Sequence, residues 1–150
     1  MKAIRTSWKT LNAPEKREKL NFSFFCPIAD FEKIENGLVP EAMEDKWFIY
    51  FEDDWLFLHR SWTGHLIFWL EFKKNGESVS VVDSWVNRVP DQYLSDDVEY
   101  DRQMVRFLID ALLLGKKAEF PITKSQASAP DGLMQHAVAG TANPEKIIDK

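Results

Sequence analysis

Residues 46–86 read KWFIYFEDDWLFLHRSWTGHLIFWLEFKKNGESVSVVDSWV, and this stretch decides the fold. Runs rich in apolar and aromatic residues predict four strands, at 46–52, 55–60, 65–72 and 79–85. The connections between them are short, at 53–54, 61–64 and 75–76, and Asn75-Gly76 is a strong hairpin-turn signal. Strands joined in this way are antiparallel neighbours, so the sequence predicts a β-meander over 46–86.

The turn lengths also predict the register. We expect Glu52 opposite Trp55, Arg60 opposite His65, and Phe72 opposite Val79. One face then carries Phe48, Tyr50, Phe57, His59, Leu66, Phe68, Leu70, Phe72, Val79, Val81 and Trp85. The other face carries Trp47, Ile49, Phe51, Leu56, Leu58, Arg60, His65, Ile67, Trp69 and Val82. A one-residue bulge would exchange these assignments.

A helix is predicted from about 98 to 114, before Gly115. Its apolar residues cover most of its circumference, which is typical of a buried helix. We expect it to cover the first face, with Leu108 and Leu112 almost fully buried. The fold class is therefore α+β, an antiparallel meander of four to six strands with one long helix packed across one face. The second face needs another cover, such as the N-terminal segment, the tail, a ligand, or a second subunit in a homodimer.

The whole chain, 1–150, is predicted to be a single domain. Residues 1–45 form a basic N-terminal segment leading to the sheet, with a short helix expected at 14–20 and another at 28–35. The meander at 46–86 and the core helix at 98–114 follow. Residues 122–150 are poor in large apolar side chains and are interpreted as a tail, either flexible or docked on the domain or on a neighbour.

Composition excludes several classes of function. The net charge of -5 argues against nucleic acid as a partner. No apolar run reaches the roughly 18 residues of a membrane helix, and no signal peptide is present, so a cytoplasmic location is the default expectation. Cys26 is the single cysteine, and with three histidines it forms no metal-ligand spacing. We therefore expect no metal and no cofactor.

One polar cluster on the predicted sheet is a candidate binding site. Trp47, Arg60 and His65 lie in one cross-strand row, and Trp62 lies in the adjoining loop. A guanidinium between aromatic rings can stack on them and still donate to a carboxylate or phosphate. The cluster therefore suggests a small anionic or nucleotide-like ligand. The structural alternative is that Arg60 and His65 hold the 61–64 loop in place.

The segments Lys46-Trp-Phe-Ile-Tyr-Phe-Glu52 and Leu58-His-Arg-Ser-Trp-Thr-Gly64 resemble the core of a group of uncharacterised bacterial proteins, close to KWFIYFE…LxxHRSWTG. The resemblance covers roughly residues 43–72. It implies no catalytic residue that can be carried over to this chain.

Two classes of function remain. The first is a non-enzymatic domain that binds a small ligand or a protein partner at Trp47, Arg60, Trp62 and His65. The second is a small hydrolase using His65 or His59 with Glu52 or Asp83. The first is preferred, because the predicted register brings no histidine and carboxylate together as an acid/base pair.

Overall fold

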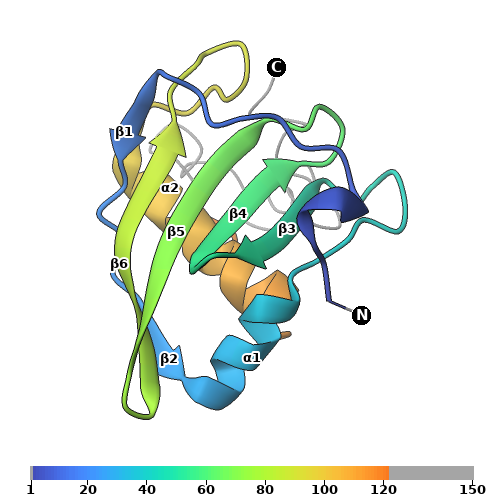
Figure 1. The fold of residues 1–150 in the computed structure, drawn as a ribbon. Helices are drawn as coiled ribbons and strands as arrows, with labels where there is room; N and C mark the ends of the chain where they lie inside the picture. Colours follow the sequence, from blue (N-terminus) through green and yellow to red (C-terminus); the bar gives the residue numbers. More distant parts are fainter. Residues whose placement is uncertain (1, 122–150) are drawn as a thin grey trace.

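The computed structural model describes residues 2–121, and the tail predicted at 122–150 lies outside them. The fold is α+β, with a six-stranded antiparallel sheet and its two longer helices packed against one face (Figure 1). The strands are β1 (Arg17–Lys19), β2 (Phe25–Pro27), β3 (Trp47–Glu52), β4 (Trp55–Arg60), β5 (Leu66–Asn75) and β6 (Ser78–Asn87). The helices are η1 (Arg5–Ser7), α1 (Ile28–Asn36) and α2 (Val98–Phe107), and α2 continues as the π-helical η2 (Leu108–Leu113).

The sheet order is β1-β6-β5-β4-β3, so the meander predicted for β3 to β6 is confirmed. The first two turns have the predicted register. Glu52 pairs with Trp55 across a turn at 53–54 whose two residues have positive φ values of 53° and 74°. The Arg60 N–H donates to the His65 carbonyl oxygen at 2.9 Å.

The third turn differs from the prediction. Phe72 pairs with Val81 and not with Val79. The positive φ of 66° falls at Gly76, and Asn75 still pairs with Ser78. The two central residues of the turn are therefore 76–77, one position later than the Asn-Gly signal indicated.

Two β-bulges then change the faces of the sheet. Ile67 is an extra residue between the pairs that β5 forms with β4, and Val82 is an extra residue between the pairs that β6 forms with β5. Because side chains alternate between the faces of a strand, each extra residue reverses the alternation beyond it.

The predicted position of the helix is therefore wrong. The helices cover the face that carries Trp47, Ile49, Leu56, Leu58, Phe68, Leu70, Phe72, Val79 and Val86. The bulge at Ile67 moves the apolar side chains of β5 onto this face and makes it the more apolar one. The opposite face carries a separate cluster of Phe48 and Tyr50 with Phe57, which packs against Ala3.

The long helix lies where the sequence places it along the chain. Asp97 caps its start by accepting hydrogen bonds from the backbone N–H groups of Glu99 and Tyr100. Leu108 is fully buried, as predicted. Leu112 is only partly buried, so that part of the prediction is wrong. It lines a cavity of about 220 Å³ beside Trp47.

Residues 2–20, here called the N-terminal strap, run across the sheet from the β3 side to β1 (Figure 1). The strap is fixed by backbone hydrogen bonds from Ala3 to Asn36, from Leu11 to Gly64, and from Arg88 back to Lys16. The helix predicted at 14–20 is wrong, because Arg17–Lys19 pairs with the edge of β6 and satisfies its backbone groups there. The helix predicted at 28–35 is confirmed as α1.

Among residues 2–121, the structure contains no helix long and apolar enough to cross a membrane.

Candidate functional site

The four residues predicted as a binding site lie in two different environments. Trp47 pairs with Arg60, as the register predicted. Both are buried, and the Arg60 guanidinium lies 5.0 Å from the centroid of the Trp47 ring and 5.7 Å from that of Tyr93. Trp62, by contrast, is 53% exposed. Trp47 and Arg60 therefore belong to the interior between the sheet and the helices.

His65 is partly buried and immediately precedes β5. Its backbone carbonyl accepts from Arg60, and its N–H donates to the Thr63 hydroxyl at 3.2 Å. The Gly64 N–H also donates to the Arg60 carbonyl, at 2.8 Å. The loop 61–64 is thus closed by two backbone hydrogen bonds, one from the Arg60 N–H and one to the Arg60 carbonyl.

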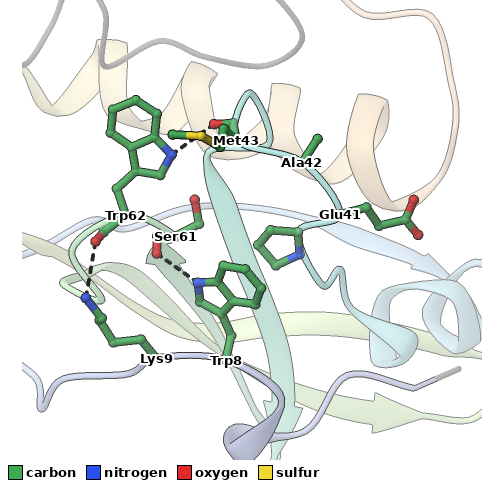
Figure 2. A pocket seen from close by; sticks show the side chains of 8 residues that line it. Trp8, Lys9, Glu41, Ala42, Met43, Ser61 and Trp62 are labelled. Carbon is green, nitrogen blue, oxygen red and sulfur yellow. Dashed lines mark hydrogen bonds between the residues drawn. The ribbon is translucent and has the colours of Figure 1, made fainter.

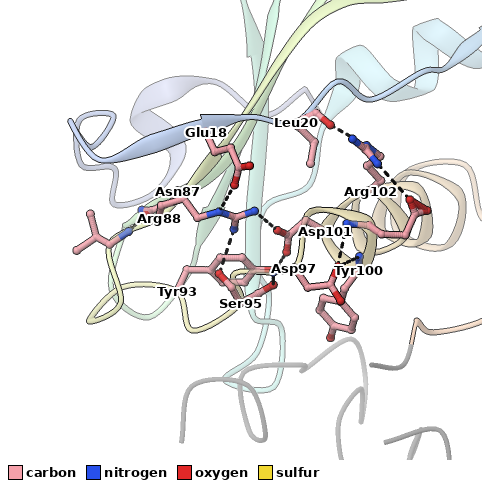
Figure 3. Close-up of polar contacts among 12 residues, drawn as sticks. Glu18, Leu20, Asn87, Arg88, Tyr93, Ser95, Asp97, Tyr100, Asp101 and Arg102 are labelled. Atoms are coloured by element: carbon pink, nitrogen blue, oxygen red, sulfur yellow. Dashed lines mark hydrogen bonds and ion pairs between the residues drawn. The ribbon is translucent and has the colours of Figure 1, made fainter. Parts of the chain in front are cut away.

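A buried polar network lies on the helix side of the sheet (Figure 3). The Asp101 carboxylate accepts from the Tyr93 hydroxyl at 2.7 Å and forms an ion pair with Arg88, also at 2.7 Å. Arg88 also pairs with Glu18 of β1 and donates to the Ser95 carbonyl. The network holds the 88–97 loop between β1 and α2.

The electrostatics of this network are those of a structural element. Burial raises the pKa of the Asp101 carboxyl, while the hydrogen bond from Tyr93 and the charge of Arg88 oppose that shift. Burial, followed by the Asp101 charge, raises the pKa of the Tyr93 phenol well above its ordinary value. Tyr93 is therefore neutral and acts as a hydrogen-bond donor within the core.

A groove of about 720 Å³ lies beside the 61–64 loop (Figure 2). We call it the tryptophan groove. It is lined by Trp8, Lys9, Pro40, Glu41, Ala42, Met43, Ser61 and Trp62. These residues come from three segments far apart in the sequence: the N-terminal strap, the 40–43 segment before β3, and the loop after β4.

Hydrogen bonds fix both indole walls of the groove. The Trp8 Nε1–H donates to the Ser61 carbonyl at 2.8 Å, and the Trp62 Nε1–H donates to the Met43 carbonyl at 2.9 Å. Each tryptophan thereby ties its own segment to another one. The indole rings keep their apolar surfaces toward the groove, while their polar atoms are satisfied by the protein itself.

The groove carries charge at its rim and behind one wall. The Lys9 ammonium lies 3.4 Å from the Trp62 carbonyl oxygen and is exposed. The Lys46 ammonium is buried and lies 2.9 Å from the centroid of the Trp62 ring, as a cation–π contact. Figure 2 shows the Glu41 carboxylate pointing away from the space between the two indoles.

His59, the other histidine considered for catalysis, is a core residue on the face that carries Phe48 and Tyr50, as predicted, but the helices cover the other face. Its ring stacks on Tyr50 at 5.6 Å and packs against Phe48. Its Nδ1 lies 2.9 Å from the Gly64 carbonyl oxygen, so Nδ1 carries the proton. Burial lowers the pKa of His59, and the hydrogen bond to Gly64 only partly opposes this.

Of the residues that line the groove, Trp62 was predicted from the sequence as a binding residue, whereas Trp8, Lys9 and Met43 were not. A tryptophan inside an otherwise polar and basic N-terminal segment was the available signal for Trp8. Met43 carried no signal in the sequence, because the groove exists only once the strap and the 40–43 segment meet the 61–64 loop.

In the described part of the chain, no three His, Cys, Asp or Glu side chains are grouped so that they could hold a metal ion. The chain matches no family model, no curated protein and no solved structure.

Proposed function

We propose that this protein is a non-enzymatic interaction module, and that the tryptophan groove receives a bulky apolar side chain of a partner protein. One observation carries the proposal. Of the eight large apolar side chains exposed among the described residues, three line this one groove: Trp8 at 40%, Met43 at 75% and Trp62 at 53%.

Such clustering is typical of binding surfaces. Large apolar side chains scattered singly over a surface need no explanation, but a contiguous patch rimmed by polar groups marks an interaction site. Tryptophan and methionine are enriched in protein–protein interfaces, and tryptophan often carries much of the binding energy. The groove is an open trough and not an enclosed chamber, which suits a segment of a protein better than an engulfed small molecule.

The walls of the groove are organised before binding. Because the indole N–H groups of Trp8 and Trp62 are bonded to backbone carbonyls, a partner does not have to order these rings. A smaller loss of side-chain freedom on association favours binding.

The geometry does not favour the alternative of a small hydrolase. His59 Nδ1 is engaged with the Gly64 carbonyl, and its ring is covered by Tyr50 and Phe48. A general base must reach the proton that it removes, and this imidazole lies inside an aromatic cluster.

The proposal is tested with the full chain labelled with 5-fluorotryptophan, whose six ¹⁹F signals are assigned with single Trp→Phe variants. Twelve-residue peptides selected from a random phage library are titrated into the labelled protein. We expect the Trp8 and Trp62 signals to shift, and those of Trp69 and Trp85 on the outer sheet face to stay in place.

Two variants complete the test. Trp62→Ala should weaken peptide binding at least tenfold. Phe25→Ala is the matched control, because Phe25 is 77% exposed but pairs with β6 beside the β5–β6 turn, at the other end of the sheet from the 61–64 loop. Equal binding by Trp62→Ala and the wild type, or shifts confined to Trp69 and Trp85, would rule out the groove as the binding site.

A further inference from the structure

We infer that the partner segment which enters the tryptophan groove is acidic, with a carboxylate next to its apolar anchor. This inference rests on the proposed function and specifies the chemistry of the partner. It follows from two observations. The Lys9 ammonium at the rim is exposed, and the Lys46 ammonium already lies against the Trp62 ring.

Most hydrogen-bond donors of the groove are already used within the protein. The two indole N–H groups donate to backbone carbonyls, and the Ser61 hydroxyl donates to the Asp45 carbonyl at 2.7 Å. The side-chain donors of Trp8, Trp62 and Ser61 are therefore not available to a partner. The two indoles offer it apolar surface instead.

Lys9 is different. Its ammonium has three donors, and its contact within residues 2–121 is the long one, 3.4 Å, to the Trp62 carbonyl. This ammonium is exposed at the rim, beside the exposed indole of Trp62. A carboxylate adjacent to an anchored apolar side chain would reach it without being buried, which avoids the large cost of desolvating a charge.

Lys46 adds a second argument, against a cationic partner. Its ammonium lies 2.9 Å from the centroid of the Trp62 ring and engages the negative face of that ring. A partner's lysine or arginine stacked on the remaining surface of Trp62 would be repelled by this charge across the ring.

The N-terminal strap extends the basic character beyond the rim. Residues 2–20 contain six basic and two acidic side chains. Arg5 and Lys19 face Glu52 and Asp83 of the sheet, whereas Lys9 faces the groove. On the opposite rim the Glu41 carboxylate points away from the anchor position (Figure 2). The charged groups placed directly beside Trp62 are therefore two cations, the exposed Lys9 ammonium at the rim and the buried Lys46 ammonium against the ring.

The test uses three synthetic peptides that differ only in charge: Ser-Gly-Asp-Trp-Asp-Gly-Ser, the same peptide with Asn in place of both Asp residues, and the same with Lys. All have blocked termini. Each is titrated into the fluorotryptophan-labelled full chain, and the dissociation constant is read from the Trp62 signal. We expect the Asp peptide to bind about two- to fivefold more tightly than the Asn peptide, as for an exposed ion pair. The Lys peptide should bind most weakly.

Two charge variants sharpen the result. In the Lys9→Glu variant, the Lys peptide should have a lower dissociation constant than the Asp peptide, the reverse of the order in the wild type. Lys73→Glu makes the same change of charge near the β5–β6 turn, away from the groove, and should keep the wild-type order. Raising the salt from 50 to 500 mM should bring the three dissociation constants together, because salt screens exposed charges.

The outcomes separate this inference from the proposed function. Equal binding of the Asp and Asn peptides with clear shifts at Trp62, or tighter binding of the Lys peptide, would overturn the acidic partner and leave the groove as a binding site. Failure of all three peptides to shift Trp62 would overturn both. If the three peptides bind Lys9→Glu in the same order of affinity as they bind the wild type, Lys9 does not select the acidic peptide.

Discussion

The Nδ1 atom of His59 lies 2.9 Å from the carbonyl oxygen of Gly64, and the backbone N–H of Leu11 donates to that same oxygen, also at 2.9 Å. One carbonyl therefore joins β4, the loop that carries Trp62, and the N-terminal strap that carries Trp8. The two walls of the tryptophan groove are held together by this oxygen and by the indole hydrogen bond from Trp8 to Ser61.

We expect His59 to make the domain less stable as the pH falls below about 6.5, the ordinary pKa of histidine. Burial lowers the pKa of His59 in the folded state, so the unfolded chain takes up the proton more readily. The stabilisation is complete above pH 6.5 and is lost as the pH falls toward the folded-state value. Its Nε2 is buried without a hydrogen-bond partner, so a proton there would have no acceptor.

The measurement is urea unfolding between pH 8 and pH 5 for the wild type and for His59→Phe, which keeps an aromatic ring beside Tyr50. The variant should show a smaller loss of stability across this range than the wild type. Parallel pH curves for the two proteins would show that His59 takes up its proton equally well in both states.

Gly37 and Gly76 should respond very differently to replacement by alanine. Gly37 has φ 67° and ψ -156°, a region that is essentially open to glycine only, and a Cβ there would clash with the Ile49 carbonyl oxygen. Gly76 has φ 66°, but a Cβ there would meet no atom within 4 Å.

We expect Gly76→Ala to cost about 1–2 kcal/mol, the ordinary penalty for the left-handed conformation. Gly37→Ala should cost more than about 3 kcal/mol, because the clash is with backbone and adds to the conformational penalty. Chemical denaturation of both variants gives the comparison. Similar losses would mean that the chain relaxes freely at Gly37.

Breaking the buried ion pair of Asp101 should be costly. The Asp101 side chain is fully buried against Arg88 and Tyr93, so Asp101→Ala leaves two buried polar groups without their partner. We expect a loss of about 3 kcal/mol or more in the free energy of unfolding. Asp110→Ala is the control. It removes an ion pair with the exposed Arg106 on the same helix and should cost about 0.5 kcal/mol or less. Equal losses would contradict the structural role of the network.

Leu108 and Leu112 test how the long helix packs. Leu108 is fully buried in the main core, so Leu108→Ala should cost about 2–5 kcal/mol. Leu112 is partly buried beside a cavity of about 220 Å³, so Leu112→Ala should cost less than half as much. Thermal and urea melts of both variants decide this. A larger loss for Leu112 would mean that the helix is rotated from the position seen here.

The predictions from sequence succeeded where structure is set by residues close together along the chain. The meander, the turn at Asp53-Asp54 and the pairing of Arg60 with His65 were all confirmed. The same holds for the helix that starts at Val98, because the Asp97 side-chain cap and an apolar stripe are local signals. Of the four residues predicted as a binding site, Trp62 alone lines the tryptophan groove.

The amino-acid sequence by itself determined the strands of the meander, their antiparallel order and the long helix. Only the tertiary structure decided which face the helix covers, because the bulges at Ile67 and Val82 depend on how neighbouring strands bury their apolar side chains together. It also created the groove, since Trp8 and Ser61 are 53 positions apart in the sequence. No local pattern encodes such a contact, because it forms only when the strap closes over a folded sheet and its polar groups find partners there.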